Sequence, residues 1–472
     1  MPYPRDLFGH GQHPPDPAWP DGARIALQVV LNFEEGGERC LLHGDAESEA
    51  FLSEIPGAAP WPGKRHWNME TIYEYGARKG FWRLHEILTA RGVPVTVFAV
   101  TSAMARAPAQ VAAMQAAGWE LACHGMRWID YADHDRAAEK AEMEAAIALH
   151  TAITGAPPRG WYTGRCSTET VDLVGEIGGF AYAADSYADE LPYWHETPSG
   201  PLLVVPYTLD ANDMRFSVSP GFNEPDEFES YLTSTFDRLY AEGAAGRPAM
   251  MSVGLHCRLA GRPGRAAALD RFLDHVAGHS GVWMATRLEI AEHWASTHPF
   301  VARAVRPSGM DKAAFVAAFG GVFEHSAWIA EEAWDFGIGP AMDTVEGLHA
   351  ALRTRFRLAD AGRRRAVLDA HPDLAGRLAT ARQLTPESAA EQSGAGLDAL
   401  TDDERARFGT LNEAYRARFG HPFIMAVKGR GKAEILAAFE ARMENIAEVE
   451  FATACAEVER IALMRLREIL AS

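Results

Sequence analysis

The chain has 472 residues, of which 47% are hydrophobic and 23% charged, as in globular rather than disordered proteins. It carries 45 Lys and Arg against 64 Asp and Glu, a formal net charge of −19, which argues against nucleic-acid binding by phosphate neutralisation. No apolar run approaches the roughly 20 residues that span a bilayer, and no export signal is visible. The five cysteines are scattered, as in proteins with reduced thiols. We therefore expect a cytoplasmic protein that contacts neither nucleic acid nor membrane.

The first 300 residues alternate short apolar, β-branched runs with helical patterns. Strands are expected at 25–33, 93–100, 119–123, 180–184, 202–207, 249–256 and 282–286, and helices between them, as at 69–90, 108–117 and 137–154. Strands that alternate with helices predict a parallel sheet built from βαβ units. Seven such repeats in about 300 residues favour a barrel.

Polar residues follow the predicted strands. Because the carboxyl ends of parallel strands in a barrel open on one rim, we expect this set to form an active site. Its members are Glu34, Glu35, Thr101, His124, Asp185, Asn212, Asp213, His256 and Arg258.

After residue 300 the strand pattern stops. Pro and Gly punctuate residues 299–309, and we assign residues 301–308 as a linker. Ser308 is expected to cap a helix that starts near Met310. Apolar residues then recur at helical spacing, as in Phe315, Phe319 and Phe323, so residues 309–472 are predicted to form an all-α helical bundle domain.

Two segments of the first domain carry its chemistry. One ends in Glu34 and Glu35, and the other contains His124 and Trp128. They resemble the polysaccharide-deacetylase superfamily, whose motifs are Thr-Phe-Asp-Asp and His-x-x-x-His and whose Asp and two His hold a metal that activates water. Here the aspartates are glutamates and the second His is Trp128. A catalytic zinc takes three protein ligands, so we expect no metal and no cofactor in this chain.

These departures resemble the metal-independent allantoinases of the same superfamily. The resemblance covers nearly all of residues 1–297 and implies a deformed (β/α) barrel of the polysaccharide-deacetylase type over residues 1–300. It also implies hydrolysis of the hydantoin ring of allantoin to allantoate. The matching segments are Arg65–Tyr75, His124–Asp130, Pro158–Arg165, Asp189–Trp194 and Gly254–Gly264.

Hydrolysis of this ring requires an activated water, a stabilised oxyanion and a pocket for a small planar ring. Glu35 and His124 are the candidates for water activation. Carbonyl polarisation and the binding of ring N–H groups are assigned to His256, Arg165, Arg258 and Asp213. We expect Trp128, together with Trp61, Trp67 and Trp161, to pave the ring site. A structural ion pair, a capped loop or core packing is the alternative for each of these residues.

In the helical half, His371 stands just before Pro372, which suits the first turn of a helix, so we expect its imidazole at an exposed helix start. Glu391 and Gln392 follow twenty residues later; spacing alone would fit two helix caps. These residues belong to segments that resemble the OHCU decarboxylases, which act on 2-oxo-4-hydroxy-4-carboxy-5-ureidoimidazoline. The matching segments are Phe323–Trp328, His371–Gly376, Glu391–Leu397, Leu411–Tyr415, Phe419–Ile424 and Val427–Gly429.

The resemblance implies a decarboxylation without cofactor, because the substrate's own ring C=N can take the electrons that CO2 leaves. His371 would be the acid that protonates the ring, and Glu391 would orient His371 or the substrate hydroxyl. The remaining implied substrate contacts are Ser326, Trp328, Pro372, Gln392, Ile424 and Arg465.

The two implied reactions are consecutive steps of urate degradation, with small-molecule substrates. The alternative is a metal-dependent carbohydrate N-deacetylase barrel joined to a non-catalytic helical oligomerisation domain, for which the long apolar pattern over 435–470 would serve. A homo-oligomer is expected in either case.

Overall fold

The computed structural model describes residues 5–7, 9–55, 57–302, 305–374 and 400–471. The chain divides into two compact units. One is Gln12–Phe300, and the other combines Met1–Gly11 with Val301–Ser472.

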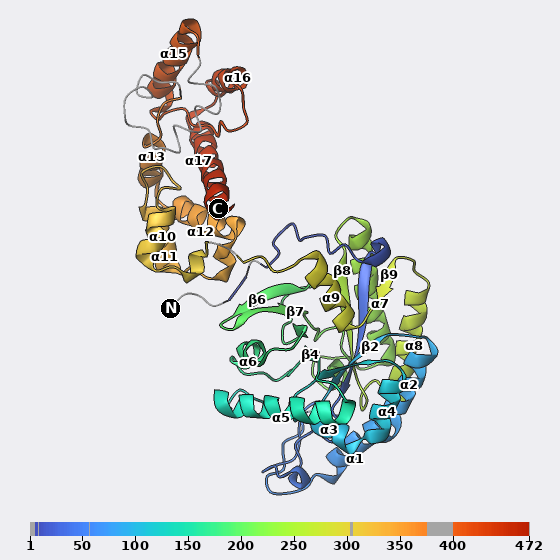
Figure 1. Cartoon of the computed structure of the whole chain (residues 1–472). Coiled ribbons are helices and arrows are strands. Elements are labelled where there is room, and N and C mark those ends of the chain that lie inside the picture. The colour runs from blue at the N-terminus through green and yellow to red at the C-terminus, as the bar shows by residue number, and fades with distance from the viewer. Residues whose placement is uncertain (1–4, 8, 56, 303–304, 375–399, 472) are drawn as a thin grey trace. The chain divides into compact units, whose positions relative to one another are not determined.

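Gln12–Phe300 is built on a curled sheet whose nine described strands follow the order β6-β7-β5-β4-β3-β2-β1-β8, with β9 also paired to β1 (Figure 1). All pairs are parallel except the β6–β7 hairpin. The strands are β1 (Ile25–Phe33), β2 (Val95–Ala99), β3 (Glu120–Cys123), β4 (Gly160–Trp161), β5 (Tyr182–Ala183), β6 (Tyr193–Thr197), β7 (Gly200–Val204), β8 (Ala249–His256) and β9 (Val282–Met284).

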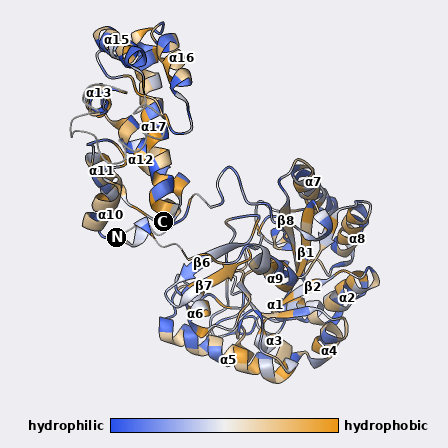
Figure 2. Cartoon of the chain, turned by 45° about the horizontal axis from the view of Figure 1, so that its top comes forward, coloured by the Kyte–Doolittle hydropathy of each residue, from blue (hydrophilic) through white to orange (hydrophobic). Residues whose placement is uncertain are grey.

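The centre of the sheet is buried along its whole length and is mostly apolar. Every residue of β1 and of β8 is buried, and much of β1 takes the hydrophobic colour in Figure 2. Continuous apolar strands are typical of parallel sheets that are covered on both faces. The register places Asn32 opposite His256 and Phe33 opposite Ala99, so the carboxyl ends of β1, β2 and β8 come together.

Helices cover this sheet on its outer side (Figure 1). They are α1 (Trp67–Tyr75), α2 (Phe81–Ala90), α3 (Thr101–Arg106), α4 (Pro108–Ala116), α5 (Arg136–Thr154), α6 (Thr170–Ile177), α7 (Pro225–Ala244), α8 (Pro263–Ala277) and α9 (Arg287–Thr297). Local signals set their ends: Asp135 caps α5 through the amide of Ala138, and Thr286 and Glu289 form the capping box of α9.

The helix predicted over 69–90 is interrupted by a π-helical turn, η3 (Gly76–Gly80), between α1 and α2. A Cβ atom on Gly76 would come within 2.5 Å of Glu35 Oε1, and one on Gly80 within 1.9 Å of the carbonyl oxygen of Cys257. Glycine at these positions therefore lets the helix lie directly against the ends of β1 and β8.

The predicted α/β architecture and its expected strands are confirmed, with somewhat shorter strands. Two strands escaped prediction. β4 has only two residues, and β6 is mostly exposed or half-buried, so neither leaves an apolar run.

The second unit is helical, as predicted. Its described helices are α10 (Lys312–Phe319), α11 (Trp328–Phe336), α12 (Val345–Leu358), α13 (Ala361–Asp369), α15 (Asp402–Phe419), α16 (Lys432–Arg442) and α17 (Ala447–Ala471). Phe315, Phe319 and Phe323 lie in its core. The expectation that Ser308 caps the first helix is wrong. Asp311 caps α10 by accepting from the amide of Ala314, while Ser308 bonds Asp343.

Across the described residues, no helix combines the length and the apolar character that a membrane span needs. The described cysteines are all free.

Candidate functional site

A cavity of about 570 Å³ opens at the carboxyl ends of the central strands of the sheet. Glu34 follows β1, His124 follows β3 and His256 ends β8, so the topology brings together three residues that lie far apart in the sequence. Its lining also includes Trp128, Arg165, Asn32, Phe51, Tyr162, Tyr207 and Asn212.

Glu34 lies between two histidines. Its Oε1 atom is 3.4 Å from His124 Nε2 and 3.4 Å from His256 Nε2. Its Oε2 atom is 2.7 Å from Nη1 of Arg258, which is completely buried. The sequence prediction named Glu35 for this position, but the carboxylate that lines the cavity is that of Glu34.

The charges of this cluster stabilise each other. Burial acts to raise the pKa of Glu34, but Arg258 and His256 hold that pKa well below its usual range. Burial likewise opposes a charge on His256, but the carboxylates of Glu34 and Asp213 raise the pKa of His256 to about 9. At neutral pH the site therefore contains an ionised Glu34 beside an imidazolium of His256.

Glu35 and Arg258 lie behind the cavity wall. Glu35 Oε1 accepts from the amide of Arg258 at 3.1 Å, and burial raises the pKa of Glu35. Arg258 donates to the carbonyl of Leu52, and its guanidinium lies over the rings of Tyr73 and Trp128. These contacts support the cluster rather than face the cavity.

Asp213 also lies behind the wall, although we had expected it to bind the substrate ring. Its carboxylate accepts from His256 Nδ1 at 2.6 Å and from the amides of His256 and Ala260 at 2.7 and 2.8 Å. Both oxygens of the Asp213 carboxylate are therefore engaged by the chain itself. Asp213 therefore fixes the orientation and charge of His256.

Two of the predicted aromatic and cationic contacts do lie in the cavity. Trp128 stacks on Phe51 with ring centroids 5.9 Å apart, and the guanidinium of Arg165 lies 5.2 Å from the Trp128 ring. The other tryptophans do not pave it. Trp61 and Trp67 are 46% and 65% exposed, and Trp161 is packed in the core with Nε1 donating to Thr163.

The donor set does not fit the metal that the deacetylase motif implies. The position of the second motif histidine is Trp128, and Oε2 of Glu34 lies 2.7 Å from the Arg258 guanidinium. Over the described ranges, Glu34, His124 and His256 do not form a set of three ligand atoms within 4.8 Å of one another. A zinc site needs three converging protein ligands, and a fixed cation at Glu34 disfavours a second one. The cluster of Glu34, His124 and His256 therefore lacks the ligand set of a catalytic zinc site.

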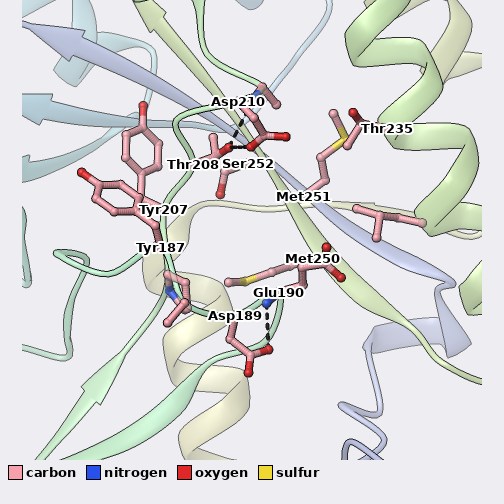
Figure 3. Close-up of a pocket in the computed structure, with 14 residues that line it drawn as sticks. Tyr187, Asp189, Glu190, Tyr207, Thr208, Asp210, Thr235, Met250, Met251 and Ser252 are labelled. Atoms are coloured by element: carbon pink, nitrogen blue, oxygen red, sulfur yellow. Dashed lines mark hydrogen bonds between the residues drawn. The ribbon is translucent and has the colours of Figure 1, made fainter. Parts of the chain in front are cut away.

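A second cavity of about 450 Å³ shares Tyr187 and Tyr207 with the first. Figure 3 shows its carboxylates, Asp189, Glu190 and Asp210, with Asp210 accepting from Thr208. Its lining contains no histidine and no cationic side chain, so it lacks the proton donors and acceptors of the first cavity.

In the helical unit, His371 follows α13 and is buried, contrary to the exposed helix start that we expected. Its Nδ1 atom lies 2.8 Å from the carbonyl oxygen of Val367. Since a carbonyl only accepts, Nδ1 carries the proton and Nε2 bears the lone pair. Burial lowers the pKa of His371 to about 4, so the ring is neutral at pH 7.

Arg465 is buried beside this histidine, paired with Glu324 at 2.8 Å. Both charges act on the pKa of His371. Sequence reasoning placed Glu324 in a matching segment but did not single it out as a site residue. The available signal was that Glu324 directly follows Phe323, one of the apolar residues at helical spacing, and a carboxylate buried beside such a residue needs a cationic partner.

The other residues predicted for the site of this unit lie in several different environments. Ser326 is buried and donates to the carbonyl of Glu324. Trp328 begins α11 and lies under the guanidinium of Arg363, Ile424 is in the core, and Pro372 is half-buried. Glu391 and Gln392 lie outside the described residues.

Comparison with known proteins assigns a family to each half. Residues 69–177 match the polysaccharide deacetylase family, and residues 308–467 match the OHCU decarboxylase family. A Schizosaccharomyces pombe protein named as a polysaccharide deacetylase is 41% identical over 317 residues, which cover 63% of this chain and 99% of that protein.

The 2-oxo-4-hydroxy-4-carboxy-5-ureidoimidazoline decarboxylase of Haloferax volcanii is 40% identical over 163 residues, 34% of this chain and 93% of that protein. Among solved structures, PuuE allantoinase is 54% identical and covers 64% of this chain and 100% of its own, with a TM-score of 0.63. The similarity to each half therefore extends over nearly the whole length of its relatives.

Proposed function

Because the chain belongs to the polysaccharide deacetylase family in its first unit and to the OHCU decarboxylase family in its second, we propose that it is a bifunctional enzyme of urate degradation. The second unit decarboxylates 2-oxo-4-hydroxy-4-carboxy-5-ureidoimidazoline to (S)-allantoin, and the first hydrolyses allantoin to allantoate. The 54% identity to PuuE allantoinase over that protein's full length carries the hydrolase assignment. The decarboxylation produces the substrate of the hydrolysis, and this supports both assignments.

In the first unit, the cavity residues divide into binding and proton-transfer groups. Trp128 offers a flat face for the planar hydantoin ring, and Arg165 offers donors for its carbonyl oxygens or those of the ureido tail. Both lie on the lining beside Glu34, His124 and His256, so a bound ring would lie against the charged cluster.

His124 is the group we assign to water activation. Its Nε2 faces the Glu34 carboxylate, and its Nδ1 has no hydrogen-bond partner among the described residues. With Nε2–H directed at Glu34, the Nδ1 lone pair can take a proton from water as the water oxygen bonds to the ring carbonyl carbon. Glu34 itself is a weak base, because its pKa is held low.

His256 is assigned as the acid. Its imidazolium, held between Asp213 and Glu34, stabilises the oxyanion that forms on the carbonyl oxygen. When the ring C–N bond breaks, His256 can give its Nε2 proton to the departing nitrogen. The immediate products are a carboxylic acid and a free ureido group, and the acid releases the second proton of the water to solvent as it becomes a carboxylate. The proton taken up by His124 returns to His256 before the next cycle.

In the second unit, the reaction breaks the bond to the carboxylate and leaves its electron pair in the ring C=N system. His371 is neutral with its lone pair on Nε2, so in the unliganded chain it accepts a proton before it can donate one to the ring. Arg465 is held by Glu324 next to it and provides a cation for the carboxylate or ureido oxygens.

We also propose that the protein is cytoplasmic and homo-oligomeric. Free cysteines support the location. Ile446 and Val449, at the start of α17, are 64% and 48% exposed, and they support an interface on this helix. Light scattering coupled to size exclusion tests the assembly, and a mass of about 51.5 kDa would contradict it.

The two activities can be separated by variants of the full-length chain. His124→Gln is expected to abolish allantoin hydrolysis and to leave decarboxylation unchanged, because His124 lies in the first unit and His371 in the second. His371→Asn should do the reverse. Loss of both activities in either variant, or of neither, would overturn the assignment of one reaction to each unit.

A further inference from the structure

Three potential metal ligands gather at the surface of the first unit, away from the catalytic cavity. Asp237 lies on α7, His275 on the last turn of α8, and His279 just beyond it. One ligand atom from each lies within 4.8 Å of the other two. The ring centroids of the two histidines are 4.7 Å apart, although His279 lies beyond the end of the helix. None of the three lines the cavity.

The histidine rings are held in place. Nδ1 of His279 bonds the carbonyl of His275 at 2.9 Å, so this nitrogen carries the proton and Nε2 keeps its lone pair for a metal. Such outer hydrogen bonds fix the tautomer and orientation of metal-binding histidines. Phe236 packs nearly perpendicular to both rings, at 84° and 73°, and Tyr240 does the same to His279.

We propose that Asp237, His275 and His279 bind one divalent cation of the zinc class, with water completing the coordination. Two imidazoles and a carboxylate are donors that zinc prefers. In a tetrahedral zinc site with bonds of about 2.0–2.1 Å, the ligand atoms lie roughly 3.3–3.5 Å apart. His275 Nε2 and Asp237 Oδ1 are 2.7 Å apart, so these two atoms have to separate by roughly 0.6–0.8 Å to reach that spacing, and the cation replaces the proton between them.

The expected role of this cation is structural. α7 and α8 pack against each other beside β8 (Figures 1 and 2), and Arg271 of α8 already pairs with Asp226 and Glu229 of α7. The cation would add a second bridge between the two helices, nearer the end of α8. Since the unfolded chain lacks the assembled ligands, binding stabilises the folded unit by mass action.

The test uses the chelator-treated, full-length chain. Zinc titration by calorimetry should show one saturable site, and cobalt substitution should give the visible absorption bands of four-coordinate Co²⁺. Zinc should also raise the melting temperature of the first unit. Asp237→Asn and His279→Gln should each weaken zinc binding at least tenfold, whereas His195→Gln, at an exposed histidine on β6, should bind zinc as the parent chain does.

Unchanged zinc affinity in Asp237→Asn would overturn the proposal, as would the absence of saturable binding in the parent chain. Asp237 is exposed, so this substitution leaves the core intact, and circular dichroism of the metal-free variant verifies its fold. These measurements do not involve allantoin, and their outcome is independent of the proposed catalytic function.

Discussion

Replacing Asp213 by Asn tests the charge on His256 directly. The pKa of His256 is about 9 against an ordinary value of about 6.5, and Asp213 is the nearer of the two carboxylates, at 2.6 Å. A hydrogen bond to a charged group contributes about 1.5–3 kcal/mol, which corresponds to about 1–2 pKa units. Asp213→Asn should therefore lower the pKa of His256 to about 7–8, while Glu34 still supports part of the shift.

The assay is the pH dependence of kcat for allantoin hydrolysis between pH 6 and 10, corrected for the uncatalysed reaction. The alkaline limb should move down by one to two units in Asp213→Asn, and nitrogen-edited NMR of the histidine rings should show the same shift. Asp210→Asn, on the same loop but bonded to Thr208 and Tyr231, is the matched control. An unmoved alkaline limb in a folded Asp213→Asn variant would refute the role of the His256 imidazolium.

Three further predictions concern stability. Because the pKa of His256 is raised, its protonation contributes fully to the stability of the first unit below about pH 6.5, and this contribution is lost as the pH rises through about 9. The free energy of unfolding of that unit should therefore fall by about 2–3 kcal/mol across this interval. Urea titrations should show this fall in the parent chain, and an equal fall in His256→Gln would contradict it. Gly76→Ala should destabilise the same unit by about 1–3 kcal/mol, because its Cβ would meet Glu35; an unchanged urea midpoint would refute the close approach. Glu324→Gln should destabilise the second unit by about 1.5–3 kcal/mol, because it removes the charge from the hydrogen bond between Glu324 and Arg465; thermal melting should show a partial recovery in Glu324→Leu/Arg465→Met, and no cost in the single variant would contradict it.

The sequence predicted most of the sheet, because its central strands are long apolar runs whose residues are all buried. It missed β6, since a strand at the edge of a sheet with only one of its five residues buried has no apolar run to reveal it. The break in the helix over 69–90 was also beyond prediction. It arises because Gly76 and Gly80 approach Glu35 and Cys257 closely, a contact made by residues far apart in the chain.

The sequence predicted which residues belong to the site better than it predicted what each of them does. The strand ends identified Glu34, Glu35, His124, Asp213 and His256 together. Which of the adjacent carboxylates Glu34 and Glu35 faces the cavity depends on how the backbone turns after β1, and the sequence does not reveal that turn. Asp213 was expected at the substrate and instead holds His256. A pairing between a loop and a strand 43 residues apart leaves no periodic trace in the sequence.

The buried His371 illustrates the same limit in the helical unit. A His before a Pro is typical of an exposed helix start, but the side chain is enclosed with Glu324 and Arg465, which come from distant segments.

The central claim is that one chain performs both reactions in sequence. Freshly generated 2-oxo-4-hydroxy-4-carboxy-5-ureidoimidazoline, supplied to the chelator-treated full-length protein and followed by carbon NMR against a control without enzyme, tests it most directly. We predict accelerated decay of the substrate, transient allantoin and final accumulation of allantoate. Decay at the control rate would contradict the decarboxylase, and allantoin that persists would contradict the metal-independent hydrolase.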